Sequence, residues 1–121
     1  MIRFKYISII CLMFIASASF AQDPKLKRKD KLLLTEGRIL LKFEDYYNAK
    51  ERWDKLLALY PDHHEFNYGV GVCLINTRGK EKESFSYLEK GLSEDNMNSY
   101  YWYGRSMHLQ HNFDKAIEYY L

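Results

Sequence analysis

The sequence predicts an all-α protein, and three observations lead to that prediction. Apolar residues recur at spacings of three and four over most of the chain, which is the period of amphipathic helices. No stretch alternates convincingly between apolar and polar residues, as a half-buried strand would. Six Gly and two Pro in 121 residues leave few positions that must break a helix. We therefore expect about six helices, each of roughly 9–15 residues, joined by tight turns.

Polar, turn-forming residues separate these helices near 43–45, 61–64, 77–80, 93–98 and 110–112. Asp45, Asp62 and Asn112 each stand just before a helical pattern and are predicted N-caps. Asp62 is followed three positions later by Glu65, which is the spacing of a capping box.

The beginning of the chain, over 1–21, has the pattern of a secretory signal peptide. Arg3 and Lys5 precede an apolar run over 7–20, and small residues at Ser19 and Ala21 predict cleavage before Gln22. This run is too short for a membrane-spanning helix, which needs about 20 residues. A lipid anchor would need a Cys at the new N-terminus, where Gln22 stands instead. We expect an exported chain without a membrane span after cleavage.

Removal of this leader changes the charge of the chain. Arg3 and Lys5 leave with it, so the 18 basic side chains fall to the number of the 16 acidic ones, and the charge gives no indication of nucleic acid binding. Residues 22–29 form a basic N-terminal arm, and the basic cluster over 25–31 is interpreted as solvated rather than as a phosphate or lipid contact. Cys73 is left as a single thiol and is expected to be a small buried residue.

A repeat runs through 30–121. Three glycines recur at nearly constant spacing, and each is followed in the next predicted helix by a small residue and, one turn later, by a large one. A glycine inside a helix costs about 1 kcal/mol relative to alanine, so such regular spacing indicates close helix packing. The predicted repeat-packing residues are Gly37, Ala49, Trp53, Pro61, Gly71, Ser84, Leu88, Gly104, Ala116 and Tyr120.

This pattern resembles the tetratricopeptide repeat, a helix–turn–helix unit of about 34 residues with W-x2-L-G-x2-Y, A-x3-F and P as its signature. The resemblance implies a right-handed α-solenoid of about three units, over 30–63, 64–96 and 97–121. Leu33, Asn67 and Tyr100 stand where the family has Trp, and the loop over 78–80 is one position longer than in the first unit. The last stretch, HNFDKAIEYYL, opens a helix that nothing closes, so we expect a fragment with an open edge and edge-to-edge self-association.

The resemblance also implies a concave face lined by the first helix of each unit. Aromatic and arginine side chains with apolar neighbours are typical of protein-binding surfaces. The alternative is that these residues pack against each other or against a following domain. A carboxylate clamp of the kind some family members have is not predicted, because Val72 interrupts it. The expected partner-binding residues are Arg38, Lys42, Tyr68, Asn76, Tyr101, Arg105 and His108.

Catalytic chemistry has no support in the sequence. His108 and His111 are three positions apart, but no third ligand with suitable spacing accompanies them, so no metal site and no cofactor are predicted. No phosphate-binding loop, nucleophile elbow or pair of acids in an apolar pocket is recognisable.

The leader and the words YNAKERWDKLLALYPD and FDKAIEYY are similar to the N-terminal part of certain Gram-negative envelope proteins. In those proteins, repeats precede a peptidoglycan-binding domain of the outer-membrane protein A type. This resemblance implies a periplasmic, outer-membrane-associated chain. Two functions follow as hypotheses: a non-catalytic scaffold that binds a protein or peptide partner, or a structural segment whose repeats pack on later domains of a larger envelope or secretion-apparatus protein.

Overall fold

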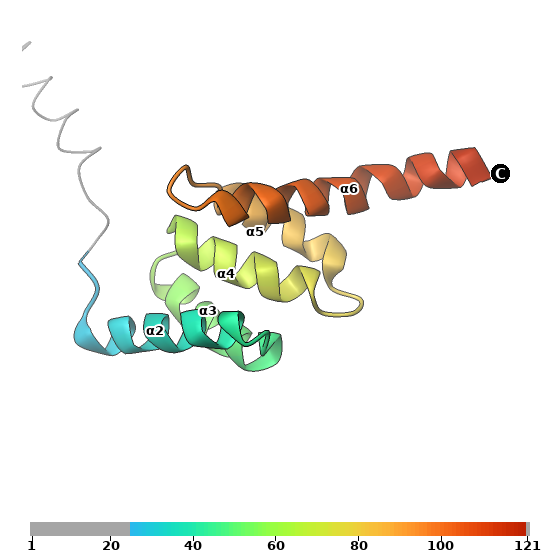
Figure 1. Cartoon of the computed structure of the whole chain (residues 1–121). Coiled ribbons are helices and arrows are strands. Elements are labelled where there is room, and N and C mark those ends of the chain that lie inside the picture. The colour runs from blue at the N-terminus through green and yellow to red at the C-terminus, as the bar shows by residue number, and fades with distance from the viewer. Residues whose placement is uncertain (1–24, 121) are drawn as a thin grey trace, which may run out of the picture.

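The computed structural model describes the backbone of residues 25–120 and the side chains of residues 25–110. Within this part the chain is helical, with no β-strand, which confirms the predicted all-α class (Figure 1). The predicted leader, the cleavage site at Gln22, the side chains of Ala116 and Tyr120, and Leu121 lie outside the described residues. The elements are α2 (Arg28–Lys42), α3 (Tyr46–Leu59), α4 (His64–Ile75), the 3₁₀ turn η1 (Glu81–Glu83), α5 (Ser84–Lys90) and α6 (Met97–Tyr120).

Successive helices pack against each other in chain order. In Figure 1, α3 runs back along α2 and α5 runs back along α4, so each pair is an antiparallel hairpin. Helix α4 also touches α2 and α6, which makes it the centre of the stack. Every residue from Phe66 to Ile75 is buried except Tyr68. A helix covered on nearly all sides needs no polar face, which explains the apolar run in this part of the sequence.

The core is organised around Trp53 on α3, of which only 1% is exposed. A methyl group on Gly37 of α2 would lie 2.9 Å from the indole ring, and one on Gly69 of α4 would lie 2.2 Å from it. The ring is therefore held between two helices at positions where neither has a side chain. We expected Gly37 to pack against the segment of Ala49, one turn away from Trp53; Gly69 has no place in the predicted repeat pattern.

Gly71 has a similar environment in the second hairpin. A methyl group there would lie 2.6 Å from the side chain of Leu88 on α5. A methyl group on Gly91, which follows α5, would lie 2.7 Å from the Tyr68 backbone. The longer loop between α4 and η1 turns at Gly79, whose φ of 85° lies in the left-handed region that glycine adopts without strain.

Helix α6 differs from the prediction. We expected a turn at 110–112 with Asn112 as an N-cap, but α6 is continuous from Met97 to Tyr120 and extends beyond the other helices (Figure 1). The turn prediction was wrong because the triplet 110–112 includes neither Gly nor Pro, and a helix passes through such residues at small cost. No atom of the described residues lies within 4 Å of a Cβ built on Gly104, so the close contact expected there is not seen in the described part of the chain.

Small residues on another face of α6 make the close contact with the rest of the stack. Ser99 and Ser106 are buried, and their hydroxyls donate to the Asn96 and Tyr103 carbonyls at 2.6 and 2.7 Å. The Tyr103 ring stacks on Phe85 of α5 at 5.5 Å between centroids. These bonds satisfy the buried hydroxyls locally, so serine is tolerated where an apolar residue would be usual.

The helix caps agree with the prediction at one position and differ at another. Asp45 caps α3 as predicted, since its side chain accepts from the Asn48 amide at 3.3 Å. Asp62 was predicted to cap α4, but the N-cap is His63 and makes no side-chain cap bond. Glu65, the expected partner of Asp62 in a capping box, instead forms an ion pair with Arg38. Glu65 therefore bonds to Arg38 on another helix and does not take part in a cap of its own helix.

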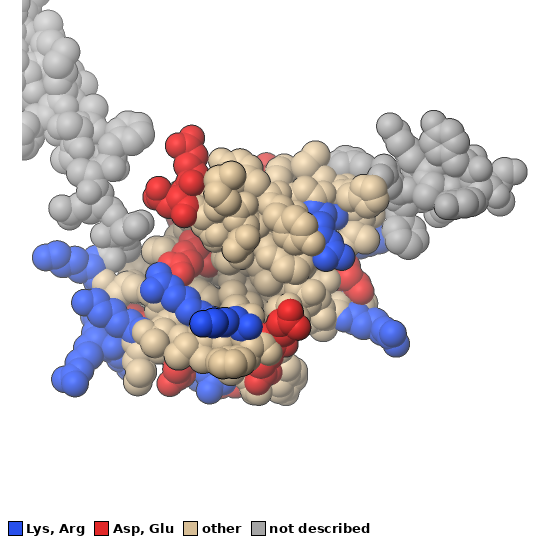
Figure 2. Space-filling view, viewed as in Figure 1, with Lys and Arg blue, Asp and Glu red and all other residues tan. Residues whose placement is uncertain are grey.

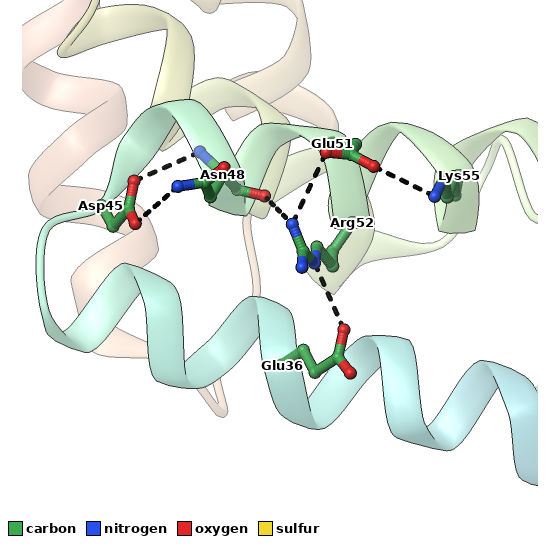
Figure 3. A network of polar contacts seen from close by, with 6 residues as sticks. All are labelled: Glu36, Asp45, Asn48, Glu51, Arg52 and Lys55. Atoms are coloured by element: carbon green, nitrogen blue, oxygen red, sulfur yellow. Dashed lines mark hydrogen bonds and ion pairs between the residues drawn. The ribbon is translucent and has the colours of Figure 1, made fainter.

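A polar network covers the outside of the first hairpin (Figure 3). Arg52 of α3 reaches Glu36 of α2 at 3.2 Å and Glu51 at 3.6 Å, and Glu51 also pairs with Lys55 at 3.2 Å. These pairs are exposed, so each contributes less than about 1 kcal/mol. Of these pairs, Arg52–Glu36 joins α3 to α2, and the other two lie within α3.

Cys73 is fully buried as a free thiol, as predicted. Burial raises its pKa from 9.0 to about 12, because the thiolate would lose its hydration inside the core.

This shift predicts a pH dependence of stability. Since the native state holds the proton more tightly, the thiol's contribution is complete below pH 9 and declines as the pH rises toward 12. The expected decline is on the order of 1 kcal/mol per pH unit within that window. Urea unfolding of the parent and of Cys73→Ala should show a smaller alkaline slope for the variant. Parallel pH curves would contradict the assignment.

Candidate functional site

The candidate site is a groove of about 410 Å³ that crosses α2, α4 and α6. The first helices of the two hairpins, α2 and α4, line it together with α6, and α3 contributes Tyr46 and Trp53. The lining residues are Arg38, Leu41, Lys42, Glu44, Tyr46, Trp53, Glu65, Tyr68, Val72, Asn96, Asn98 and Trp102.

An ion pair joins α2 to α4 at this groove. Arg38 donates from Nε and an Nη nitrogen to the two Glu65 carboxylate oxygens at 2.6 and 2.8 Å. The hydrogen bond to Glu65 raises the pKa of Arg38, so the guanidinium stays charged. The pair is largely exposed, so its contribution to stability is small, below about 1 kcal/mol. Its geometric effect is larger, because a two-point bond holds both side chains in one orientation.

Aromatic rings provide the apolar part of the groove. Tyr68 is half-buried, and burial raises the pKa of its phenol, although hydrogen bonds with Asn96 and Trp102 act in the opposite direction. Trp53 also lines the groove, and its buried Nε1–H has no partner among the described residues. An unpaired buried donor costs about 1–3 kcal/mol. One residue that lines the groove therefore carries a buried hydrogen-bond donor that the described part of the protein does not satisfy.

A cation–aromatic cluster lies beside the groove on α6. The Arg105 guanidinium carbon is 5.5 Å from the centre of the Trp102 ring and 6.0 Å from that of Tyr101. The two rings meet edge to face at 5.2 Å. All three groups lie on one helix, and Trp102 is the member of the cluster that lines the groove.

The structure brings together only part of the predicted partner-binding set. Arg38, Lys42 and Tyr68 line the groove. Tyr101 and Arg105 are exposed beside the groove. Both contact Trp102, which does line it.

The other two predicted residues lie away from the groove. Asn76 ends α4, donates to the Val72 carbonyl at 2.8 Å and lines a separate hollow of about 850 Å³ at the loop end of the hairpins. His108 is exposed farther along α6 and is not among the groove-lining residues.

Sequence reasoning missed Trp102 and Asn98 on α6, and Glu65 on α4. We aligned α6 with the other first helices through Gly104, which assigned Tyr101 and Arg105 to the groove. Gly104 makes no close contact, so it does not set the rotation of α6 about its axis. The buried serines would have given the correct side, since Ser99, Trp102 and Ser106 follow helical spacing. Glu65 was assigned to a cap, and no local signal indicated its pairing with Arg38.

Among the described residues, no three His, Cys, Asp or Glu side chains gather as metal ligands would. No described helix is long and apolar enough to cross a bilayer. No protein family, curated protein or solved structure gives a significant match to the chain.

Proposed function

We propose that this chain is an exported, non-catalytic scaffold of the tetratricopeptide type that binds a peptide or a partner domain in the groove across α2, α4 and α6. The observation that carries the proposal is this groove, to which the first helices of the two hairpins, α2 and α4, and the following helix α6 contribute polar and aromatic side chains. The glycine contacts at Gly37 and Gly71 support a repeated hairpin, since each receives a large side chain from the next helix. The leader pattern supports export, and the resemblance to Gram-negative envelope proteins favours a periplasm as the destination.

The composition of the groove favours a peptide as ligand. The rings of Tyr68 and Trp102 offer stacking surface, and the amides of Asn96 and Asn98 can both donate and accept hydrogen bonds. Peptide backbones need both kinds of partner and carry no net charge. The groove's cations, Arg38 and Lys42, are balanced by Glu44 and Glu65, so its formal charge is also zero.

The experiment is a selection of random peptides on the immobilised chain, followed by titration of the enriched sequences. Both tryptophans of the chain line the groove, so binding should alter the intrinsic fluorescence. Trp102→Ala is expected to weaken binding by about 5- to 150-fold, because it removes about 1–3 kcal/mol of aromatic contact. Isothermal titration calorimetry measures the affinity of that variant, which has lost one fluorophore.

The matched control is Tyr47→Ala, which removes an aromatic side chain that is 87% exposed on α3 and does not line the groove. Peptides that bind the parent and Trp102→Ala with equal affinity would exclude the groove as their site. Loss of binding in Tyr47→Ala alone would place the site on α3.

One observation also favours the structural alternative. Met97, Tyr100, Tyr101 and Met107 are exposed on α6, around the open position at Gly104. Such a surface would suit packing against another domain of a larger envelope protein. Fusing the downstream coding sequence and measuring hydrogen exchange along α6 tests this, since packing predicts protection that the isolated chain lacks.

A further inference from the structure

The outward face of α2 carries large apolar side chains that the core does not use. Leu32, Ile39 and Phe43 are 61%, 49% and 75% exposed. Their spacing of seven and four positions places them on one side of the helix, while Gly37 faces Trp53 on the opposite side. A shallow hollow beside Leu32 is lined by Arg28, Lys29, Lys31 and Thr35.

This face belongs to a strongly basic segment of an otherwise acidic chain. The segment 25–43 contains seven Lys or Arg and two Asp or Glu, a net charge of +5, whereas 44–121 contains nine and thirteen, a net charge of −4. Of the two acids, Asp30 is buried and accepts a hydrogen bond from the Tyr60 hydroxyl at 3.2 Å, and Glu36 pairs with Arg52. Figure 2 shows Lys and Arg side chains gathered over the start of α2.

The cations at the start of α2 are not balanced within the described part of the chain. Among residues 25–110, no acidic side chain forms an ion pair with Lys25, Lys27, Arg28, Lys29 or Lys31. Lysines of the acidic part, such as Lys50 and Lys55, do have such partners. The first turn of a helix is also the positive end of its dipole, where added cations are unfavourable. An external anionic surface would reduce the repulsion among these cations and their repulsion by the positive end of the helix dipole.

We propose that the outward face of α2 docks on an anionic lipid surface, with Leu32, Ile39 and Phe43 entering the headgroup region and the basic cluster contacting lipid phosphates. A helix that combines an apolar line with flanking Lys and Arg lies in the plane of a membrane interface. Lipid is favoured over a second copy of the chain because a single lipid surface offers both an apolar region for Leu32, Ile39 and Phe43 and phosphates for the adjoining basic cluster. The groove plays no part in this inference.

The experiment is co-sedimentation of the full chain with vesicles of phosphatidylcholine, alone or with about a third phosphatidylglycerol. The variant Lys27→Gln/Arg28→Gln/Lys29→Gln/Lys31→Gln is expected to lower the partition coefficient for anionic vesicles at least about tenfold, since each cation near the surface adds to binding. Raising NaCl from about 0.05 to about 0.5 M should weaken the parent's binding in the same direction. Ile39→Ser/Phe43→Ser should reduce binding with the charges intact.

The control removes four lysines elsewhere: Lys50→Gln/Lys55→Gln/Lys80→Gln/Lys90→Gln. It makes the same change in net charge and should bind anionic vesicles like the parent. The segment 1–24 is identical in every protein, so its own affinity for lipid cancels in the comparison.

Three outcomes would overturn the proposal. One is equal binding of the parent and the four-site α2 variant to anionic vesicles. Another is retention on polyphosphate beads without any vesicle binding, which would indicate a free phosphate ligand. The last is a parent dimer in sedimentation velocity that the α2 substitutions dissociate, without vesicle binding, which would make the face a contact between copies. Circular dichroism of each variant confirms that the helices are retained.

Discussion

Replacing Trp53 by alanine is expected to lower the free energy of unfolding by about 3–5 kcal/mol. The ring is buried between Gly37 and Gly69, and these positions have no side chains that could move into the cavity. Small domains have a total stability of about 5–15 kcal/mol, so the variant should be marginally folded. Urea unfolding followed by circular dichroism measures the loss without relying on tryptophan fluorescence.

Trp53→Phe is the informative companion. It keeps an aromatic ring and removes the indole N–H, which has no partner in the described part of the parent. Its loss of stability should therefore be clearly smaller than that of the alanine variant. A loss below about 1 kcal/mol for Trp53→Ala would mean that the ring is not the centre of the core.

Gly69→Ala is expected to destabilise the chain by about 1–3 kcal/mol, although alanine is the better helix former. The added methyl would lie 2.2 Å from Trp53 Cδ2, and the ring cannot retreat because Gly37 lies close on its other side. Thermal or urea unfolding shows directly whether Gly69→Ala lowers or raises the free energy of unfolding.

The matched control is Gly104→Ala, where the added methyl group meets no atom of the described residues within 4 Å. It should stabilise the chain by up to about 1 kcal/mol, the intrinsic helix preference. If both alanine variants shift stability in the same direction, the close approach at Gly69 is wrong. In a Trp53→Leu background, Gly69→Ala should lose much of its cost, since neighbouring substitutions are not additive.

Much of the helical content could be predicted because it follows from apolar periodicity, which is local. The turns near 43–45 and 61–64 were recognised, and Asp45 caps α3 as expected. The turn predicted near 110–112 was wrong, since α6 continues through these residues. The polar triplet there permits a helix as readily as a turn. That outcome depends on tertiary packing and not on local preference.

The site was less predictable for a geometric reason. Sequence alignment of the glycines gives the groove positions only if every glycine sits in an equivalent contact. Gly37 and Gly71 do receive large side chains, and Arg38 and Val72, the residues that follow them, line the groove. Gly104 receives none, so α6 presents Trp102 where Arg105 was expected. Gly69 escaped notice because a sequence offers no sign of which ring will approach a glycine.

The position of Trp53 has a consequence for the order of folding events. Gly37 and Gly69 lie equally far before and after it in the chain, on the two neighbouring helices, so the central contacts of the core join segments that are close in sequence. Chains with such short loop closures fold quickly, in microseconds to milliseconds for helical proteins. One ring also couples three helices, so the first hairpin cannot detach from α4 without exposing the indole. We therefore expect α2, α3 and α4 to form and melt as a single cooperative unit, with α6 exchanging its amides independently.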